Sequence, residues 1–299
     1  MKLPQFRPML PTSEPLAAAS GYVHEIKWDG FRALAYLAEQ VSLVSRGGSV
    51  LNDRFSAILP ELAKLGRGLV LDGEIVALNR AGKPEFSLLK TRGEAPLVYI
   101  VFDILLQGGK SLCPQPWRKR RVILESVVAT GKNILLSPLL PGTQADSLMF
   151  AEREGLEGII SKKVDSPYLP GRRSSFWRKH KIIKDVDCVV VGVNRVNGRC
   201  RSFLAALYTA DQTLLYVGSV GSGLGGRELA FLKEAASRLG QAACPVVNPP
   251  RPQGSISWFR PHLVAKVQYL EFTPGCKLRH PVFLQFRFDK KAAECVFGS

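Results

Sequence analysis

The 299-residue sequence lacks the features that mark exported, membrane-spanning or zinc-binding proteins. No apolar run approaches the ~18 residues that a membrane-spanning helix requires. The first residues contain no continuous apolar core of the kind found in signal peptides. The six cysteines are scattered without a Cys-x-x-Cys pair, which argues against a zinc site and against a disulfide framework. We therefore expect a cytoplasmic protein without membrane association, whose cysteines are small buried apolar side chains.

Acidic residues are few relative to basic ones. The sequence has 41 Lys and Arg against 25 Asp and Glu, a formal net charge of +16. The excess is spread along the chain, because residues 1–185 alone hold 27 basic and 18 acidic side chains. This charge favours a polyanionic partner, either nucleic acid or an acidic membrane surface. Hydrophobic residues make up 46% of the sequence, which is enough for one large or two medium-sized domains.

Lysine, rather than histidine or cysteine, carries the candidate chemistry. The four histidines match no metal-binding or catalytic-triad spacing, so we expect no catalytic role for them. Lys27 has carboxylates two residues before it and two residues after it, with bulky apolar residues between them. A solvated lysine, with a pKa of about 10.4, is a poor nucleophile, whereas partial desolvation and nearby cations free an amine for attack. Taken alone, Lys-x-Asp-Gly is also typical of a charged hairpin turn.

Periodicity predicts a mixture of strands and helices up to about residue 185. The expected strands are Tyr22–Lys27, Phe31–Leu37, Val41–Ser45, Leu69–Leu78, Val98–Leu106 and Glu157–Lys163. Helices are expected over 52–65, capped by Asn52 or Asp53, and over 117–129 and 143–154. The basic cluster Arg118-Lys119-Arg120-Arg121 is expected to be a solvated helix face.

Beyond residue 185 the pattern changes to short strands interrupted by one helix. The strands are expected over Cys188–Val193, Ser202–Tyr208, Leu214–Val217, Leu263–Phe272 and Phe283–Phe288, and the helix over Arg227–Leu239. This order of elements suits a five-stranded barrel of the OB type.

Six short motifs follow one another along the chain. They are Lys27-x-Asp29-Gly30-x-Arg32, Ser45-Arg46-x-Gly48, Asp72-Gly73-Glu74, Phe102-Asp103, Glu157-Gly158 with Lys162, and Trp177-x-Lys179-x-Lys181. Their order resembles the motif series of the covalent nucleotidyltransferases, and within them that of an ATP-dependent DNA ligase of the bacterial minimal or ligase-D type. The resemblance runs from about Phe6 to the C-terminus. It implies an α+β fold, with a nucleotidyltransferase (adenylation) domain of mainly antiparallel sheets at 1–185 and an OB-fold β-barrel at 186–299.

The resemblance implies a three-step reaction through a lysine-bound AMP. ATP first adenylates the lysine, the AMP then passes to a DNA 5′-phosphate, and a 3′-hydroxyl finally displaces it. Lys27 would carry the AMP, and Lys179 and Lys181 would contact the α-phosphate from one face of a strand. Asp29 would position the turn that follows the nucleophile.

Other residues would hold the nucleotide. By family resemblance, Glu25 reads the adenine edge and Phe102 offers a flat surface for stacking. Glu74 and Glu157 would lie near the ribose and a divalent cation, Mg²⁺ or Mn²⁺, because carboxylates accept from hydroxyls and bind such ions through oxygen. Arg46 would contact the ribose or a DNA phosphate.

Three more cations are assigned to phosphates by the same resemblance. Arg32 would contact the phosphate at the nick. Arg287 and Lys290 belong to the family's C-terminal motif, which closes over the pyrophosphate of ATP. Phe288 departs from that motif, because an acidic residue is expected between Arg287 and Asp289.

The expected substrate is nicked or broken double-stranded DNA, bound by a monomer associated with the nucleoid. Ligase-D relatives work with a Ku-type end-binding protein and a repair polymerase, so the resemblance implies these partners too. Two alternatives stay open: a GTP-dependent RNA capping guanylyltransferase, which shares Lys-x-Asp-Gly and an OB domain, and a non-catalytic OB-type DNA-binding protein. Labelling with α-labelled ATP or GTP separates all three.

Overall fold

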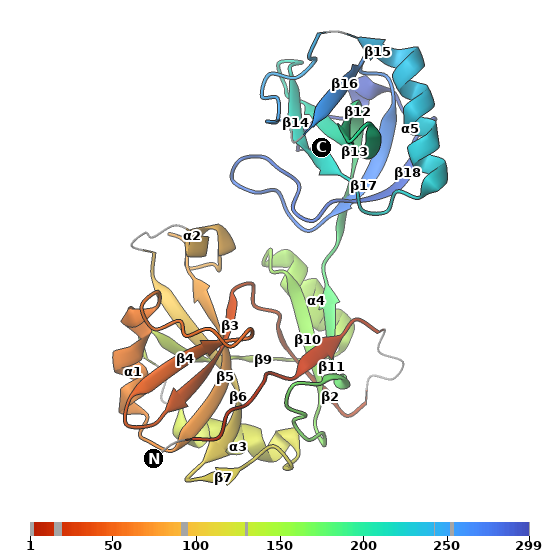
Figure 1. The fold of residues 1–299 in the computed structure, drawn as a ribbon. Coiled ribbons are helices and arrows are strands. Elements are labelled where there is room, and N and C mark those ends of the chain that lie inside the picture. The colour runs from red at the N-terminus through yellow and green to blue at the C-terminus, as the bar shows by residue number, and fades with distance from the viewer. Residues whose placement is uncertain are drawn as a thin grey trace. The chain divides into compact units, whose positions relative to one another are not determined.

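The computed structural model describes residues 3–14, 20–90, 95–128, 131–241, 243–251 and 254–298. The chain divides into two compact units, Met1–Ile182 and Ile183–Ser299 (Figure 1). Each unit has its own hydrophobic core and is described separately below. Within the described residues, no helix is long and apolar enough to cross a membrane.

The first unit contains a six-stranded sheet. Its strands, in spatial order, are β4 (Val41–Ser45), β3 (Phe31–Leu37), β5 (Leu69–Ala77), β6 (Leu97–Gln107) and β7 (Lys110–Ser111), and β8 (Ile134–Leu136) runs parallel to β6. All other neighbours in this sheet are antiparallel. Side chains alternate between the two faces of a strand. Along β3, Ala33 and Ala35 therefore join a different buried cluster from Leu34 and Tyr36.

Helices cover one face of this sheet. They are the 3₁₀ turn η1 (Ser56–Ile58) and the helices α1 (Leu59–Lys64), α2 (Phe86–Lys90) and α3 (Trp117–Val127). Leu62 of α1, Leu89 of α2 and Leu124 of α3 are buried in one cluster with Ala33 and Ala35 of β3. The opposite face of the sheet is thereby left to pack against the second sheet of the unit.

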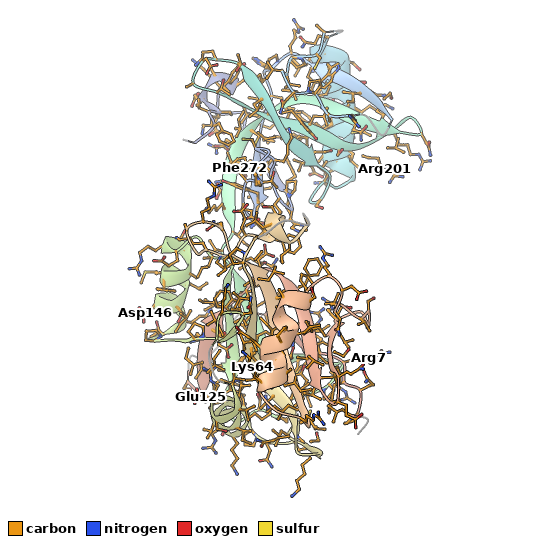
Figure 2. All side chains as sticks on the ribbon, turned by 90° about the vertical axis from the view of Figure 1, so that its left-hand side faces the viewer. Arg7, Lys64, Glu125, Asp146, Arg201 and Phe272 are labelled. Carbon is orange, nitrogen blue, oxygen red and sulfur yellow. The ribbon has the colours of Figure 1, made fainter. Side chains whose placement is uncertain are left out.

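A five-stranded sheet completes the first unit. Its spatial order is β1 (Leu10–Thr12), β11 (Arg173–Lys181), β10 (Gly158–Lys163), β2 (Tyr22–Ile26) and β9 (Leu139–Leu140). Helix α4 (Gln144–Arg153) packs on β10 and β2. Its first turn is fixed by a capping box between Thr143 and Asp146, the second of which is labelled in Figure 2. Leu34 and Tyr36 of β3 share a buried cluster with Trp177 of β11, so the two sheets pack face to face.

The helix predicted over 52–65 was wrong in its first half. The Asn52 amide accepts from Leu43 N at 2.8 Å and donates to Val41 O at 2.8 Å, so it ties the chain to β4 instead of capping a helix. The α-helix begins only at Leu59, with Pro60 in its first turn. Proline fits there because it has no backbone N–H to leave unpaired.

The expectation that residues 118–121 form a solvated face holds for Arg118 and Lys119, which are exposed, but it is wrong for Arg120 and Arg121, which are buried. The side chain of Arg120 is fully buried, and its guanidinium donates to both carboxylate oxygens of Asp103 at 2.8 and 2.9 Å. It also donates to the carbonyls of Gln115 and Ser166. Asp103 of the Phe102-Asp103 motif therefore supplies a buried counter-ion for α3.

We predict that Arg120→Ala lowers the free energy of unfolding by about 3–5 kcal/mol, because it leaves the Asp103 charge buried and unpaired. Arg118→Ala is the matched control. Its ion pair with Asp165 is exposed on both sides and should contribute at most about 1 kcal/mol. Urea unfolding of both variants makes the comparison, and similar small losses would contradict the proposed importance of the buried pair.

The second unit is a β-barrel. Its elements are β12 (Lys184–Val196), β13 (Arg199–Tyr208), β14 (Leu214–Val220), α5 (Gly226–Leu239), β15 (Gly240–Gln241), β16 (Ser255–Phe259), β17 (Val264–Tyr269), β18 (Val282–Phe286) and the 3₁₀ turn η2 (Ala292–Glu294). β12 pairs with β13 on one edge and with β17 and β16 on the other. β17 pairs with β18, and a parallel bridge between Ser222 and Val282 joins the end of β14 to β18.

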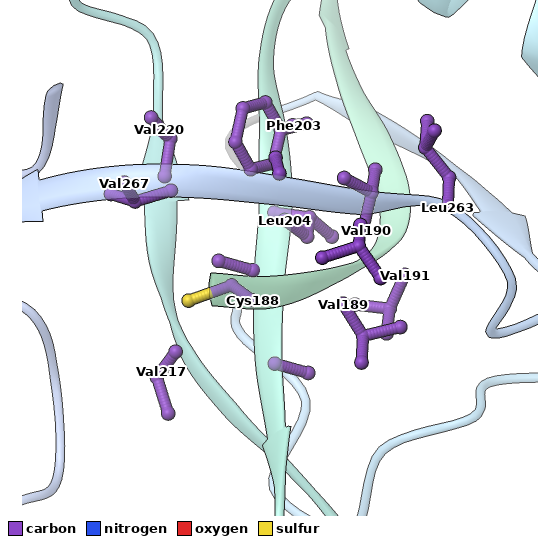
Figure 3. Close-up of a cluster of buried hydrophobic side chains, with 14 of the residues drawn as sticks. Cys188, Val189, Val190, Val191, Phe203, Leu204, Val217, Val220, Leu263 and Val267 are labelled. Atoms are coloured by element: carbon purple, nitrogen blue, oxygen red, sulfur yellow. The ribbon is translucent and has the colours of Figure 1, made fainter. Parts of the chain in front are cut away.

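These pairings close a five-stranded cycle, so the predicted OB-type barrel is confirmed. Valine is the most frequent of the buried residues in its core, and Val190, Val217 and Val267 are among those labelled in Figure 3. Valine suits this position because a branched side chain packs well on a pleated surface.

Candidate active site

A pocket of ≈ 270 Å³ lies in the first unit and is lined from both sheets. Eight of the residues that the sequence predicted for the site line it: Glu25, Lys27, Arg32, Arg46, Glu74, Phe102, Lys179 and Lys181. Glu157 contacts two of these lysines directly, and Asp29 follows Trp28, which also lines the pocket. The structure therefore brings together in the first unit every predicted site residue except Arg287 and Lys290.

Two lysines share one carboxylate at the pocket. The Lys27 ammonium donates to Glu157 Oε2, and the Lys181 ammonium lies 3.0 Å from Glu157 Oε1. The Lys27 side chain is 18% exposed, so it is largely desolvated yet reachable. The Glu157 carboxylate thus holds the Lys27 ammonium with one oxygen and the Lys181 ammonium with the other.

Strand register explains this meeting of residues that are 130 positions apart. β10 lies between β2 and β11, and its first residue, Gly158, lies opposite Lys181. The backbone N–H of Lys27 donates to Gly158 O at 2.9 Å, and that of Ile182 donates to Glu157 O at 3.0 Å. Glu157 is therefore fixed between the ends of the two neighbouring strands.

Lys179 shares a face of β11 with Lys181 and Trp177, as the alternation predicted. Burial and the neighbouring charge of Lys181 lower the pKa of the Lys179 ammonium. Several cations are thus crowded at one end of the pocket, an arrangement that favours an anionic ligand.

Two glycines of the motifs are required by close backbone approach. A Cβ atom on Gly30 would lie 2.2 Å from the carbonyl oxygen of Ile75, so the turn after Asp29 can pack against β5 only with glycine there. Gly158 has a φ of +143°, and a Cβ on it would lie 2.0 Å from His180 O. These glycines hold Lys27 and Glu157 in register with their neighbouring strands.

Arg32 is bound by an aspartate beneath the pocket. Its guanidinium donates to both oxygens of Asp72 at 3.0 and 2.7 Å, and Tyr168 Oη donates to the same carboxylate at 2.6 Å. The guanidinium carbon lies 5.2 Å from the centre of the Phe102 ring and 5.4 Å from that of Trp177. Contact between Arg32 and a nick phosphate remains a prediction, and it requires the phosphate to share Arg32 with Asp72.

Glu74 is the pocket carboxyl with the most strongly altered acidity. Desolvation raises its pKa to about 8, although the charges of Arg32 and Lys27 oppose this rise. The raised pKa means that Arg32 and Lys27 only partly offset the cost of desolvating the ionised carboxylate. A bound cation would stabilise the ionised form further. Glu74 and Glu157 thus have the oxygen chemistry that Mg²⁺ prefers.

The donor set fits a substrate-assisted metal site. Among the described His, Cys, Asp and Glu side chains, no group of three or more could hold a metal ion. Mg²⁺ commonly binds one or two carboxylates together with substrate phosphates and waters, rather than an all-protein cage. Two carboxylates at a phosphate-binding pocket match that pattern.

Arg287 and Lys290 lie in the second unit and share the carboxylate of Asp187. Arg287 Nη1 lies 3.1 Å and Lys290 Nζ 2.8 Å from Asp187 Oδ2. Arg287 also donates to Asp289, and this bond lowers the pKa of the Asp289 carboxyl to about 2. Both cations are therefore paired with carboxylates of their own unit.

Sequence reasoning gave no role to several residues at these sites. Arg173 and Trp28 line the pocket, and Asp187 holds the two cations of the second unit. Arg173 has the same parity along β11 as Trp177, Lys179 and Lys181, so strict alternation could have identified it. The sequence around Asp187 contains no pattern that predicts its role, because its partners Arg287 and Lys290 are about one hundred positions away.

Family models match both units. The one described as ATP dependent DNA ligase domain matches residues 12–181, and the one described as ATP dependent DNA ligase C terminal region matches residues 197–290. The first match contains the whole pocket except Leu10 and Pro11.

Curated relatives match nearly the whole chain. It is 36% identical over 303 residues to the multifunctional non-homologous end joining protein LigD of Mycobacterium bovis, covering 97% of this chain and 39% of LigD. It is 31% identical to DNA ligase C1 of Mycolicibacterium smegmatis, covering 97% of this chain and 94% of that protein. The chain thus spans about two fifths of the LigD relatives and nearly all of ligase C1.

Solved structures give the same picture. The ligase domain of M. tuberculosis LigD matches with a TM-score of 0.56 and 33% identity, over 98% of each chain. A mycobacterial DNA ligase D complexed with ATP and MES matches with a TM-score of 0.57 and 34% identity, over 97% of this chain and 98% of that one. With one family model covering more than half of its residues and a ligase matched almost end to end, the chain belongs to the ATP-dependent DNA ligases.

Proposed function

We propose that the protein seals 5′-phosphate/3′-hydroxyl breaks in double-stranded DNA at the cost of ATP, through AMP carried on Lys27. One observation supports this more than any other: Lys27 lies in a pocket with Lys179 and Lys181 and is held by Glu157. A largely desolvated amine beside two further cations is suited to attack a phosphate and to neutralise the charge that develops on it.

In the first step the Lys27 nitrogen attacks the α-phosphorus of ATP. An N–P bond forms and the P–O bond to pyrophosphate breaks. The Lys27 ammonium loses two protons to solvent and keeps one on the phosphoramidate nitrogen. Lys179 and Lys181 neutralise the α-phosphate during this step, since phosphoryl transfer depends mainly on positioning and charge. Asp29 and Gly30 hold the turn that aims Lys27.

The rest of the pocket would bind the nucleoside. Glu25 and Phe102 lie in its wall and would bind the base by its edge and its ring face, and Glu74 would accept from the ribose. Arg46, exposed at the same pocket, would contact the ribose or a DNA phosphate. Arg32 would contact the nick phosphate, and Arg287 and Lys290 the pyrophosphate.

A divalent cation, Mg²⁺ or Mn²⁺, would be held by Glu74 and Glu157. When bound, it supplies positive charge to phosphate oxygens during the transfer. Glu157 binds the ammonium groups of Lys27 and Lys181, which supports its role as a cation ligand.

The test is labelling followed by sealing. The protein is incubated with α-labelled ATP or GTP and Mg²⁺, separated under denaturing conditions, and then mixed with a nicked duplex. We expect an adduct with ATP that disappears as the nick is sealed. An adduct with GTP alone would favour a capping guanylyltransferase, and no adduct with either would favour a non-catalytic DNA-binding protein.

The names of the LigD relatives support a role in non-homologous end joining. We therefore extend the proposal to broken ends, with a Ku-type end-binding protein and a repair polymerase as partners of a monomeric ligase. A reaction on chromosomal DNA would place the protein in the cytoplasm with the nucleoid. Co-purification with a Ku-type protein, and ligation of broken ends stimulated by it, test this part separately.

We predict that binding to nicked DNA weakens steeply with salt. The charge of +16 suggests that phosphate contacts dominate the affinity. If ~6 phosphates are neutralised, the affinity should fall on the order of 10³-fold between about 50 and 200 mM salt. Fluorescence anisotropy with a labelled nicked duplex measures this dependence. A nearly flat response would show that the basic surface does not hold the DNA.

A further inference from the structure

A buried tyrosine packs against the pocket wall and has no role in the chemistry described above. Tyr168 is 1% exposed and belongs to the segment between β10 and β11. Its ring meets the Trp177 ring edge-on, with centroids 5.6 Å apart, and the Arg120 guanidinium carbon lies 5.7 Å from its centre. Packing around the ring therefore holds the phenol oxygen at one place beside the pocket.

The Tyr168 hydroxyl directs its proton to Asp72. Its oxygen accepts from the backbone N–H of Met9 at 2.8 Å and donates to Asp72 Oδ2 at 2.6 Å. A hydroxyl has a single proton, and the Met9 N–H can only donate, so the direction of both bonds is fixed. Burial, followed by the charge of Asp72, raises the pKa of this phenol well above its usual value, so the proton is kept at neutral pH.

Asp72 in turn sets the orientation of Arg32. Its carboxylate is fully buried and accepts from Arg32 Nε through Oδ1 and from Arg32 Nη2 through Oδ2. The bond from Tyr168 reaches the same Oδ2 and so restrains rotation of the carboxylate. A guanidinium has five N–H donors, and Asp72 uses two of them, which leaves three for a ligand in the pocket that Arg32 lines.

The orientation of Arg32 matters for a phosphate ligand. Arginine binds a phosphate most strongly through two parallel N–H groups, so the angle of the guanidinium decides whether the second bond forms. The Phe102 and Trp177 rings lie 5.2 and 5.4 Å from its central carbon and limit its tilt. Its rotation within its own plane is set by the two bonds to Asp72. A turned carboxylate would therefore turn the donors that remain for the phosphate.

We propose that Tyr168 positions Arg32 for the phosphate at the nick, acting through Asp72. This inference rests on the proposed sealing reaction and deepens it. In the last step a bond forms from the 3′-oxygen to the nick phosphorus, the bond from that phosphorus to AMP breaks, and the hydroxyl proton passes to solvent. A correctly oriented Arg32 stabilises the charge on the phosphate under attack. Tyr168 does not line the pocket and is a positioning residue.

Tyr168→Phe tests this proposal, because it removes only the hydroxyl. Sealing of a nick that already carries AMP is measured at single turnover with saturating protein. Its rate should fall at least on the order of tenfold, as expected for the loss of a hydrogen bond to a charged group. Affinity for the same nick, measured by fluorescence anisotropy, should hardly change, since many phosphates hold the DNA. Labelling of Lys27 by α-labelled ATP should change by no more than a few-fold, because no nick phosphate takes part in it.

Tyr36→Phe is the matched control. The Tyr36 side chain is also buried, and its hydroxyl accepts from Phe6 N at 2.9 Å and donates to Phe6 O at 3.3 Å. The control therefore removes another buried phenol hydroxyl that binds the N-terminal segment, but one whose bonds go to Phe6 and not to Asp72. It should leave the sealing rate, the nick affinity and the labelling close to those of the unaltered protein.

A double variant shows whether Tyr168 acts through Arg32. Arg32→Gln should slow sealing of the adenylated nick by at least as much as Tyr168→Phe does. The variant Y168F/R32Q should then seal no more slowly than R32Q alone, because two residues that act through one contact are not additive. Circular dichroism checks the fold of each variant. Losses that multiply in the double variant would assign Tyr168 a role independent of Arg32 and overturn the proposal.

The same assays separate the possible failures. If the unaltered protein neither labels with ATP nor seals the adenylated nick, the proposed function itself falls. If it does both, and Tyr168→Phe loses labelling and sealing in equal measure, Tyr168 supports only the fold and the positioning role is overturned. A variant that seals at the unaltered rate, or that loses nick affinity alone, contradicts the positioning role as well.

Discussion

Lys27→Ala should abolish the covalent adduct with AMP. The reaction requires an amine that can reach the α-phosphorus. The motif order singles out Lys27, which lines the pocket and is held there by Glu157. Gel separation after incubation with α-labelled ATP measures the adduct, and circular dichroism checks the fold. Loss of labelling should be complete. Sealing that starts from ATP should be lost with it, because the later steps then have no AMP to transfer.

Two further variants make this test specific. Lys27→Arg should fail equally, because a guanidinium stays protonated at neutral pH and is not a nucleophile. Lys181→Ala should slow labelling without abolishing it, since it removes a neighbouring charge but keeps the nucleophile. Persistent labelling of Lys27→Ala would instead assign the AMP to another lysine of the pocket.

The candidate site could be predicted from the sequence because each motif is contiguous and lies at or beside a strand. Alternation along β11 was enough to set Lys179 and Lys181 on one face. The sequence could not reveal that Glu157 binds Lys27 and Lys181 together. That contact depends on β10 lying between β2 and β11, and β2 and β10 are more than a hundred residues apart in the sequence.

The errors have a common physical cause, which is tertiary contact overriding a local pattern. Four consecutive basic residues look solvated, yet Arg120 is buried because Asp103 from a neighbouring strand pairs with it. Asn52 looks like a helix cap, yet its amide is taken by the backbone of β4. In both cases the polar group is satisfied by a neighbouring strand, and the local helical pattern does not show which strand will lie beside it.

The barrel was easier to predict than its charged surface. Short apolar strands around one helix indicated the OB architecture, and the closing bridge between Ser222 and Val282 agrees with it. Asp187, by contrast, was not singled out, although it holds both Arg287 and Lys290. The two predicted pyrophosphate ligands are paired with carboxylates of their own unit.

Arg287→Ala should separate the first step of the reaction from the last. Pyrophosphate gains negative charge as the P–O bond of ATP breaks, and a guanidinium beside it stabilises that charge. Sealing a nick that already carries AMP releases AMP and no pyrophosphate, so it requires no such cation. We expect adenylation of Lys27 to fall roughly 10³- to 10⁵-fold, as for other arginines that neutralise a phosphoryl-transfer transition state. Sealing of the pre-adenylated nick should be largely retained.

The measurement is a pair of single-turnover assays with the same variant, one starting from ATP and one from the adenylated nick. Arg238→Ala is the matched control: it removes an arginine of the same unit whose ion pair with Glu234 is exposed on α5. It should change neither rate by more than a few-fold, since exposed pairs of this kind contribute little. Phe288, between Arg287 and Asp289, departs from the family motif. The two assays therefore test whether Arg287 stabilises the leaving pyrophosphate although its neighbour differs from the motif. Equal losses in the two assays would mean that Arg287 does not act on the leaving pyrophosphate. Its role would then be to stabilise the barrel through its ion pair with Asp187, or to bind DNA.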